Sequence, residues 1–517
     1  MQRIEHSTRR VGTGVAGLDA ILNGGLPRDR FYLVQGDPGV GKTTLALQFL
    51  MEGRRVGEPG HYVTLGVTPD ELAGVAASHG WSLEGITIFE VSTGESEEDL
   101  REEESYDVFH PSEIELGEVM RTLIAEAERV NPRRVVIDSL SEVRLLARDP
   151  LRYRRQLLAL KRFFVERGAT VLLLDAGSDS KIGDLQSNTL VHGVLRLEQN
   201  MPSFGLKRRR LSVVKLRGVR FDDGYHDFKV ETGGLRVYPR VAPPPAGPAV
   251  VAPSHRGDGR LVPEVVRSGL PALDALLGGG LTWGSSTIVM GPVGAGKSTL
   301  SGQYAAAAAE RGERAVVFTF DESEETFVMR SEGVGMRMRD KVAAGSVRVV
   351  QVDPGELAPG EFVHMVRQAV ERDGARVVVI DSLNGYLNAT PDERFLIVQL
   401  HELLAYLGSR GVCTLLIVAQ HGLMGHGMEA PLDASYLADS VIMLRYFEHD
   451  GHVRKAISVV KKRTGPHEQT IREFEIMPGR IRVGEPLAGF RGVLTGVPEY
   501  AGAGGALMGG GHGRQGA

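Results

Sequence analysis

Apolar residues along the chain fall into short runs, with longer segments of helical spacing between them. The runs include "FYLVQG" from Phe31, "HYVTL" from His61, "RVVVID" from Arg376 and "TLLIVA" from Thr414, which are typical of strands buried on both faces. Segments such as "RFLIVQLHELLAYLGSR" from Arg394 predict the intervening helices. The alternation predicts an α/β fold with mostly parallel sheets flanked by helices.

The chain repeats itself along its length. The segment that starts at Thr13 matches the segment that starts at Ser268, with a constant offset of 255 residues. Later matches, "RRVVIDSLSEV" with "ARVVVIDSLNGY" and "SVVKLRG" with "SVVKKRTG", follow in the same order. A tandem duplication of a whole domain explains this pattern. We expect a first domain over 1–242, an extended linker over 243–262, a second domain over 263–485 and a flexible tail over 486–517.

The last part of each predicted domain has strand-like pieces without helices between them. In the first copy these pieces are "VLRLEQN", "RLSVVKLRG" and "DFKVETGGLRVYP". Consecutive strands joined by short connections form antiparallel hairpins. We therefore predict an antiparallel edge on each sheet.

Composition and charge narrow the class of protein. Of the 517 residues, 42% are hydrophobic and 24% are charged, which is typical of a soluble globular protein. The net charge of -5 provides no overall electrostatic attraction to nucleic acid. No apolar run approaches the roughly 20 residues of a membrane span. The first residues lack the apolar core of a signal peptide. We expect a cytoplasmic protein in which Cys413 is a small buried hydrophobic residue.

Two glycine-rich loops carry the clearest chemistry. "GDPGVGKTTL" from Gly36 and "GPVGAGKSTL" from Gly291 each follow a predicted strand and precede a predicted helix, as in loops whose backbone N–H groups bind the phosphates of ATP. We expect Lys42 and Lys297 to reach the phosphates. The predicted nucleotide-binding residues are Gly36, Gly39, Gly41, Lys42, Thr43, Thr44, Gly291, Gly294, Gly296, Lys297, Ser298 and Thr299.

Oxygen ligands for Mg²⁺ are predicted beside each loop. Thr43 and Ser298 follow the loop lysines, and Asp138 and Asp381 end strongly apolar strands later in each copy. A carboxylate at that position can hold the metal that accompanies ATP. The alternative for both aspartates is a helix N-cap, and their order after each loop favours the metal role.

The two copies differ after the next predicted strand. The second copy reads "VVFTFDESEET" and places Asp321 and Glu322 just beyond the strand, whereas the first copy has Gly66 and Val67 there. Adjacent carboxylates repel each other, which makes one of them more basic and able to accept a proton from water or a hydroxyl. The alternative is a solvated acidic turn.

Basic residues recur near the end of each copy. Lys215 and Arg217 in the first copy, and Lys461 and Arg463 in the second, alternate along a predicted strand, so both members of each pair face one side. Such a pair suits the charge of a phosphoryl group, often one bound by a neighbouring subunit. The alternative is a charged edge strand that prevents aggregation.

These motifs, in this order and over nearly the whole chain, resemble the KaiC family of circadian clock proteins. The resemblance implies two RecA-like domains, a two-tiered homohexameric ring with ATP between subunits, ATPase activity and serine/threonine autokinase activity in the second domain. It implies a catalytic role for Asp321 and Glu322. Ser435 matches the family's phosphoacceptor serine, and Tyr436 stands where the family has threonine. The alternative for Ser435 is an unmodified turn or capping serine.

We therefore predict that the first loop holds ATP as a structural clamp between subunits. The second loop is predicted to support slow hydrolysis and phosphoryl transfer to Ser435. One alternative is a non-enzymatic ring, clamped by ATP, whose tail or outer face recruits regulatory proteins. A RecA-like ATPase acting on DNA is a further alternative, against which the acidic balance argues.

Overall fold

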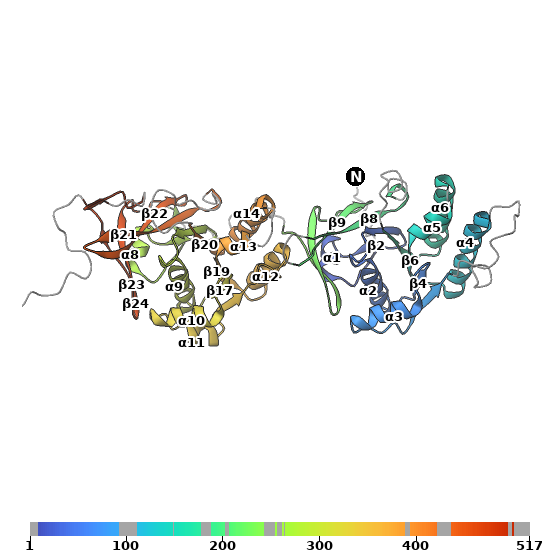
Figure 1. Cartoon of the computed structure of the whole chain (residues 1–517), viewed down its shortest axis with the longest axis horizontal. Coiled ribbons are helices and arrows are strands. Elements are labelled where there is room, and N and C mark those ends of the chain that lie inside the picture. Colours follow the sequence, from blue (N-terminus) through green and yellow to red (C-terminus); the bar gives the residue numbers. More distant parts are fainter. Residues whose placement is uncertain are drawn as a thin grey trace, which may run out of the picture. The chain divides into compact units, whose positions relative to one another are not determined.

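The computed structural model describes two compact units that meet in sequence at Arg240 and Val241 (Figure 1). The residues it describes are 9–91, 111–147, 149–176, 188–201, 206–241, 254–255, 261–262, 264–387, 393–420, 436–494 and 499–500. None of the helices in these ranges is long and apolar enough to cross a bilayer.

Unit 1 is built on one nine-stranded sheet with the order β11-β10-β9-β8-β3-β7-β6-β4-β5. Strands from β8 to β5 in this order are parallel, and β8 to β11 pair antiparallel, which confirms the predicted edge. The strands are β3 (Phe31–Gly36), β4 (Gly60–Thr64), β5 (Ile86–Glu90), β6 (Arg134–Asp138), β7 (Thr170–Asp175), β8 (Gly193–Asn200), β9 (Arg208–Leu216), β10 (Tyr225–Glu231) and β11 (Gly234–Tyr238).

Helices cover both faces of this sheet, because the strand residues alternate between two apolar layers. Tyr32 and Val34 of β3 pack in one cluster with residues of α2, and Phe31 and Leu33 pack in another with residues of α4 to α6. The helices are α1 (Ala16–Ile21), α2 (Lys42–Arg55), α3 (Pro69–Ser78), α4 (Pro111–Val130), α5 (Leu140–Ala147) and α6 (Pro150–Glu166), and β1 (Arg10–Val11) pairs with β2 (Leu26–Pro27).

Unit 2 repeats the same architecture, with the strand order β18-β17-β19-β20-β16-β21-β22-β23-β24. Cys413, the first residue of β20, is fully buried as predicted. The strands are β16 (Ser286–Gly291), β17 (Arg314–Thr319), β18 (Val347–Gln351), β19 (Ala375–Asp381), β20 (Cys413–Ala419), β21 (Ser440–His449), β22 (His452–Lys462), β23 (Ile471–Met477) and β24 (Arg480–Pro486).

The helices of unit 2 also lie on both faces of its sheet, with separate apolar clusters on each side. They are α8 (Pro271–Leu276), α9 (Lys297–Glu310), α10 (Glu324–Gly333), α11 (Met338–Ala343), α12 (Pro359–Glu371), α13 (Leu383–Leu387) and α14 (Glu393–Ser409), and β14 (Val265–Val266) pairs with β15 (Leu281–Thr282).

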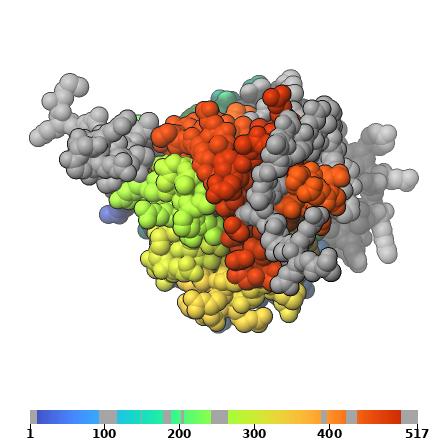
Figure 2. All heavy atoms as spheres, turned by 90° about the vertical axis from the view of Figure 1, so that its left-hand side faces the viewer, coloured from blue at the N-terminus to red at the C-terminus, as the bar shows by residue number. Residues whose placement is uncertain are grey.

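The antiparallel strands of unit 2 pack beside its first residues, where Figure 2 shows the red C-terminal strands against the yellow-green start of the unit. Lys462 donates hydrogen bonds to the carbonyls of Leu277 and Gly280, the latter at 3.0 Å. The hydroxyls of Thr282 and Thr464 lie 2.7 Å apart. These contacts join the first segment of the unit to the strand that carries Lys461.

Two segments predicted to be extended or flexible contain short paired strands. Within the predicted linker, β12 (Ser254–His255) pairs with β13 (Leu261–Val262), and within the predicted tail β25 (Phe490–Arg491) pairs with β26 (Glu499–Tyr500). Leu487 and Val493 pack against Phe447 of β21 and are 6% and 1% exposed. Apolar residues scattered through this part of the tail therefore cover the antiparallel edge.

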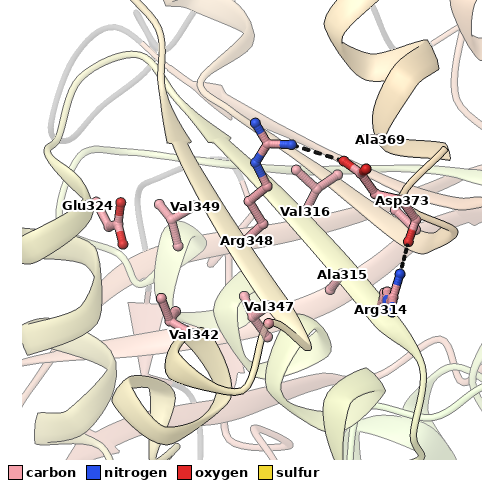
Figure 3. A pocket seen from close by; sticks show the side chains of 12 residues that line it. Arg314, Ala315, Val316, Glu324, Val342, Val347, Arg348, Val349, Ala369 and Asp373 are labelled. Atoms are coloured by element: carbon pink, nitrogen blue, oxygen red, sulfur yellow. Dashed lines mark hydrogen bonds and ion pairs between the residues drawn. The ribbon is translucent and has the colours of Figure 1, made fainter.

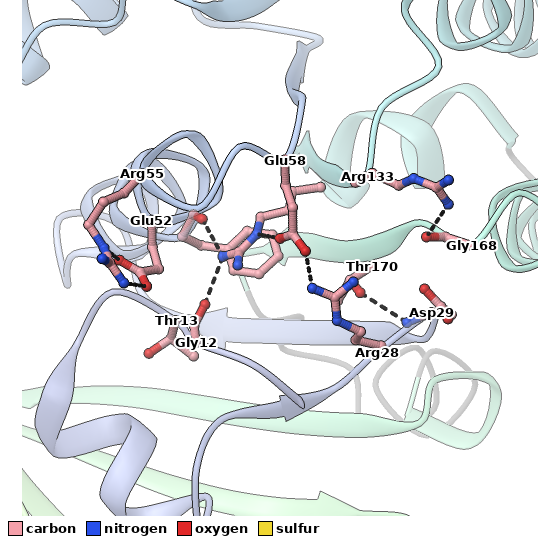
Figure 4. Close-up of polar contacts among 12 residues, drawn as sticks. Gly12, Thr13, Arg28, Asp29, Glu52, Arg55, Glu58, Arg133, Gly168 and Thr170 are labelled. Carbon is pink, nitrogen blue, oxygen red and sulfur yellow. Dashed lines mark hydrogen bonds and ion pairs between the residues drawn. The ribbon is translucent and has the colours of Figure 1, made fainter. Parts of the chain in front are cut away.

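A buried arginine connects separate parts of unit 1, and its partners Glu58 and Gly12 are labelled in Figure 4. Arg134, the first residue of β6, is 1% exposed, and its Nε lies 2.6 Å from a carboxylate oxygen of Glu58. Its Nη1 donates to the carbonyls of Gly12 at 2.7 Å and Phe49 at 2.8 Å. The guanidinium also lies over the Phe49 ring. One side chain thus connects β6, α2 and the segment that follows β1.

Arg134→Ala is expected to lower the free energy of unfolding of unit 1 by about 3–5 kcal/mol. The change removes one of the two arginine partners of Glu58, which keeps Arg28, and leaves the carbonyls of Gly12 and Phe49 without this donor. Urea unfolding followed by the fluorescence of Trp81, with Trp283→Phe as the background, measures unit 1 by itself. Arg55→Ala breaks an exposed ion pair and serves as the control that changes stability little. Equal unfolding midpoints for the two variants would contradict this account.

Candidate functional site

Each glycine-rich loop connects the central strand of its sheet to the helix behind it. Gly41 and Gly296, the residues before α2 and α9, have φ of 116° and 103°, a backbone conformation that glycine adopts without strain. A Cβ at Gly296 would lie 2.5 Å from the side chain of Ile476, so the loop also needs glycine for space. The other predicted loop glycines are Gly36, Gly39, Gly291 and Gly294.

The loop lysines fold over their own loops. Lys42 donates to the carbonyls of Gly36 at 2.5 Å and Asp37 at 3.0 Å, and Lys297 donates to the carbonyl of Pro292 at 2.8 Å. Burial lowers the pKa of both lysines, and the nearby carboxylates Asp138 and Asp381 oppose this shift. Each ammonium group therefore lies against the loop whose backbone N–H groups are predicted to bind phosphate.

In unit 1, Asp138 at the end of β6 lies beside the phosphate loop. Its Oδ2 accepts a hydrogen bond from the Thr43 hydroxyl at 3.5 Å and a shorter one, at 2.6 Å, from the phenol of Tyr62. Burial raises the pKa of the Asp138 carboxyl, and the bond from Tyr62 and the charge of Lys42 oppose this shift. Thr44, the next predicted loop residue, is buried in α2.

In unit 2, Asp381 holds the same place at the end of β19, but its surroundings differ. Burial raises the pKa of its carboxyl to about 6, although a hydrogen bond from Ser298 opposes the shift. Its Oδ2 is buried and receives no hydrogen bond within the described part of the chain. A buried oxygen without a partner, next to a hydroxyl and a glycine cradle, fits a site for nucleotide with Mg²⁺.

The predicted carboxylate pair follows β17. Glu322 is bound to Arg330 of α10, with 2.5 Å between Oε1 and Nη2, and Arg330 also donates to the hydroxyl of Thr299 at 3.2 Å. Asp321 accepts a hydrogen bond from Ser382 at 2.7 Å. Both carboxylates are therefore connected to the phosphate end of the sheet, one through α9 and the other through the residue after Asp381.

Unit 1 has no carboxylate in the corresponding turn. Thr64, the last residue of β4, receives hydrogen bonds from the backbone N–H groups of Gly66 and Val67 and donates to the carbonyl of Val67 at 2.8 Å. The turn is closed on itself by this hydroxyl. The two units thus differ in the side chains that this turn itself carries.

The predicted basic pairs donate hydrogen bonds to the segments that precede β8 and β21. Lys215 donates to the carbonyl of Val191 at 2.8 Å and Arg217 to that of Thr189 at 2.9 Å. In unit 2, Lys461 donates to the carbonyl of Ala438 at 2.8 Å and Arg463 to that of Tyr436 at 3.1 Å. The pairs recur in the structure as they do in the sequence.

Ser435, the predicted phosphoacceptor, lies outside the described residues. Tyr436 follows it directly and is 54% exposed. Arg463 binds the carbonyl of Tyr436, the residue that follows the predicted acceptor in sequence.

Several residues at the phosphate end were not predicted from the sequence. Tyr62, Arg330 and Ser382 contact predicted site residues through their side chains, and Asp175 at the end of β7 pairs with Arg144 at 2.6 Å. Tyr62 and Asp175 lie in apolar runs typical of buried strands, and Arg330 lies in α10. The sequence signal for Asp175 was its position at a strand end. The signal for Tyr62 was a polar group within an apolar run, and relating it to Asp138 requires knowing that β4 and β6 are neighbours.

A separate hollow of about 590 Å³ lies at the outer strands of unit 2 (Figure 3). Residues at the beginnings of three strands, such as Arg314, Val347 and Ala375, line it, and Asp373 pairs there with Arg348 at 2.9 Å. The phosphate-loop residues and Asp381 do not line this hollow. It is therefore distinct from the candidate nucleotide site.

Two tandem α/β units, each with a phosphate loop and an aspartate at the end of a nearby strand, define a tandem P-loop nucleoside triphosphatase. The family model described as "ATPase: KaiC" matches residues 11–242 and 266–488. The chain therefore belongs to the KaiC family of ATPases and uses a nucleotide, as the motifs predicted.

Curated relatives align along almost the whole chain. "Circadian clock protein KaiC3" of Synechocystis sp. is 26% identical over 504 residues, which cover 95% of each chain. "Circadian clock oscillator protein KaiC" of Synechococcus elongatus is 25% identical over 501 residues, covering 95% of this chain and 92% of the relative. The protein of the same name in Parasynechococcus marenigrum is 24% identical over 500 residues.

Asp381→Asn is expected to raise the thermal unfolding temperature at pH 7 in the absence of nucleotide and Mg²⁺. The folded state raises the pKa of this carboxyl from 3.8 to about 6, so it binds more protons than the unfolded state between these values. Ionisation therefore costs stability above about pH 6, by at most about 3 kcal/mol, and the cost disappears as the pH falls.

The gain from Asp381→Asn should accordingly shrink between pH 7 and pH 5, measured by differential scanning fluorimetry. Asp340→Asn changes an exposed carboxylate of the same unit and is the control. A variant that unfolds below the parent by the same amount at every pH would show that burial does not penalise the charge of Asp381.

Proposed function

We propose that the second phosphate loop hydrolyses ATP and that the first holds ATP with little turnover. The observation that carries this assignment is the carboxylate pair after β17, for which the first unit has Gly66 and Val67. Hydrolysis needs a group that accepts a proton from the attacking water, and neither glycine nor valine provides one. Both loops keep the glycines, lysine and hydroxyl that bind phosphate.

In the proposed reaction, a water oxygen attacks the γ-phosphorus while the bond from that phosphorus to the β–γ bridging oxygen breaks. Glu322 accepts the proton of the water, and Lys297 stabilises the charge on the phosphate oxygens. Arg330 acts as a positioning residue, because it binds the Glu322 carboxylate and the hydroxyl of Thr299 together.

Mg²⁺ is proposed as the metal at both loops. Thr43 with Asp138, and Ser298 with Asp381, supply the hard oxygen atoms that this ion prefers. When bound, the ion supplies positive charge that neutralises the phosphate oxygens. The hydrogen bond from Thr43 to Asp138 supports this assignment, since it brings the hydroxyl and the carboxylate of unit 1 together.

We further propose serine autokinase activity with Ser435 as the phosphoacceptor, as the family resemblance implies. The Ser435 hydroxyl would attack the γ-phosphorus of ATP bound by an adjacent subunit, with the same bond to ADP breaking, and would give its proton to the carboxylate pair Asp321 and Glu322 of that subunit. The hydrogen bond from Arg463 to the carbonyl of Tyr436 supports a cation close to the transferred group. Tyr436 carries its hydroxyl farther from the backbone, so it is not proposed as an acceptor.

Assembly into a homohexamer with ATP at subunit interfaces is also proposed. Lys215, Arg217, Lys461 and Arg463 donate to backbone carbonyls at equivalent places in the two units, and Arg463 also lies 3.9 Å from a carboxylate oxygen of Asp439. The positive charges of these basic residues suit the phosphates of a nucleotide bound by the adjacent subunit. Nucleotide bound there stabilises the assembly by mass action even where it is not hydrolysed. The names of the relatives support a role in circadian-type regulation.

Glu322→Gln is expected to reduce phosphate release by about 100-fold or more while ATP remains bound, because the amide cannot accept the proton. Release is measured with the full chain, Mg²⁺ and ATP, and bound nucleotide is quantified in parallel. Glu325→Gln alters a nearby exposed carboxylate and should leave the rate unchanged. Hydrolysis that survives in Glu322→Gln and is lost in Lys42→Ala would assign turnover to the first unit instead.

Incubation with γ-labelled ATP is expected to label the full chain, and Ser435→Ala should abolish that label while Tyr436→Phe retains it. Phosphate release without any label in the parent would make the chain an ATPase without kinase activity. Absence of both signals would favour the ATP-clamped scaffold.

A further inference from the structure

The phosphate ends of the two units differ at one buried strand position. Tyr62 of β4 lies opposite Val136, two residues before Asp138, whereas Val317 of β17 lies opposite Val379, two residues before Asp381. Tyr62 and Val317 are both fully buried. The two residues therefore occupy equivalent places, and only the first has a polar group.

The phenol of Tyr62 changes what surrounds the proposed metal-binding carboxylate. It donates a hydrogen bond to Oδ2 of Asp138 at 2.6 Å, which is shorter than the 3.5 Å bond that the same oxygen accepts from Thr43. In unit 2, Oδ2 of Asp381 is buried without a hydrogen-bond partner among the described residues. The carboxylate that ends the strand thus accepts a hydrogen bond from a phenol in unit 1, and the carboxylate of unit 2 has no such donor among the described residues.

A hydrogen bond to a carboxylate competes with any cation that draws on the same oxygen. The phenol withdraws negative charge from Oδ2 and fixes the rotation of the carboxylate. Its hydroxyl is enclosed by the sheet and α2, so giving up this acceptor would leave a buried donor unsatisfied. No corresponding cost arises beside Val317, which has no donor.

We propose that Tyr62 is a specificity-determining residue that makes nucleotide binding by unit 1 less dependent on Mg²⁺ than nucleotide binding by unit 2. This inference rests on the proposed role of both loops in binding ATP. It gives the first loop a property suited to a clamp, since a nucleotide that depends less on the metal is retained when the metal concentration falls.

The test measures the affinity of the full chain for a fluorescent ATP analogue with Mg²⁺ and with a chelator. The dissociation constant measured with the chelator, divided by that measured with Mg²⁺, reports how strongly binding depends on the metal. Lys297→Ala isolates the first loop, and Lys42→Ala isolates the second. We expect a smaller ratio for the first loop than for the second. Adding Tyr62→Phe to Lys297→Ala should increase the ratio by about tenfold. Adding Val317→Tyr to Lys42→Ala should decrease it.

Tyr32→Phe is the matched control in the Lys297→Ala background. Tyr32 is also a fully buried tyrosine of the unit 1 sheet, but its hydroxyl donates to the carbonyl of Pro27, at 2.5 Å, and not to Asp138. The ratio should not change in this variant. A change equal to that of Tyr62→Phe would overturn the inference, because the effect would then come from loss of any buried phenol.

An unchanged ratio in Tyr62→Phe, with the analogue still bound, overturns the inference and leaves the proposed function intact. Failure of the parent chain to bind the analogue under either condition overturns both. Tyr62→Phe keeps the ring that packs in the core, so the decisive variant does not depend on whether the larger side chain of Val317→Tyr is accommodated.

Discussion

The carboxyl ends of neighbouring parallel strands emerge at one edge of a sheet, and the proposed phosphate loops, metal-binding aspartates and catalytic carboxylates of this chain depend on that constraint. The phosphate loop follows β3 in unit 1 and β16 in unit 2, and Asp138 and Asp381 end strands two places away. Asp321 and Glu322 follow the next strand outward. Residues separated by tens to hundreds of positions in sequence thereby meet around one site.

The sequence was sufficient for the fold and for the groups carried by local motifs. Continuous apolar runs such as "FYLVQG" can be satisfied only by strands covered on both faces, and the repeat showed that one architecture occurs twice. The phosphate loops were predictable because a helix N-terminus and its glycines are contiguous in sequence. Asp138 and Asp381 followed from their position at the ends of such runs.

Contacts between distant residues were not predictable in the same way. Tyr62 and Arg134 lie in buried strands, where the pattern indicates burial but not that a phenol meets Asp138 or that a guanidinium meets Glu58. Arg330 is one charged residue of an amphipathic helix, and its contact with Glu322 depends on how α10 packs. The packing of Leu487 and Val493 likewise depends on the antiparallel edge that the tail meets.

The duplicated units have kept their backbone and changed the partners of their carboxylates. In unit 1, Asp138 is bound by Tyr62, and the buried Asp175 is bound by Arg144 and by the hydroxyl of Ser141. In unit 2, a buried oxygen of Asp381 has no partner among the described residues. Each lone pair of Asp138 that the hydroxyl of Tyr62 or Thr43 occupies is one fewer for a metal ion. The proposed division of roles between the two units therefore needs only side-chain changes at one edge of the same sheet architecture.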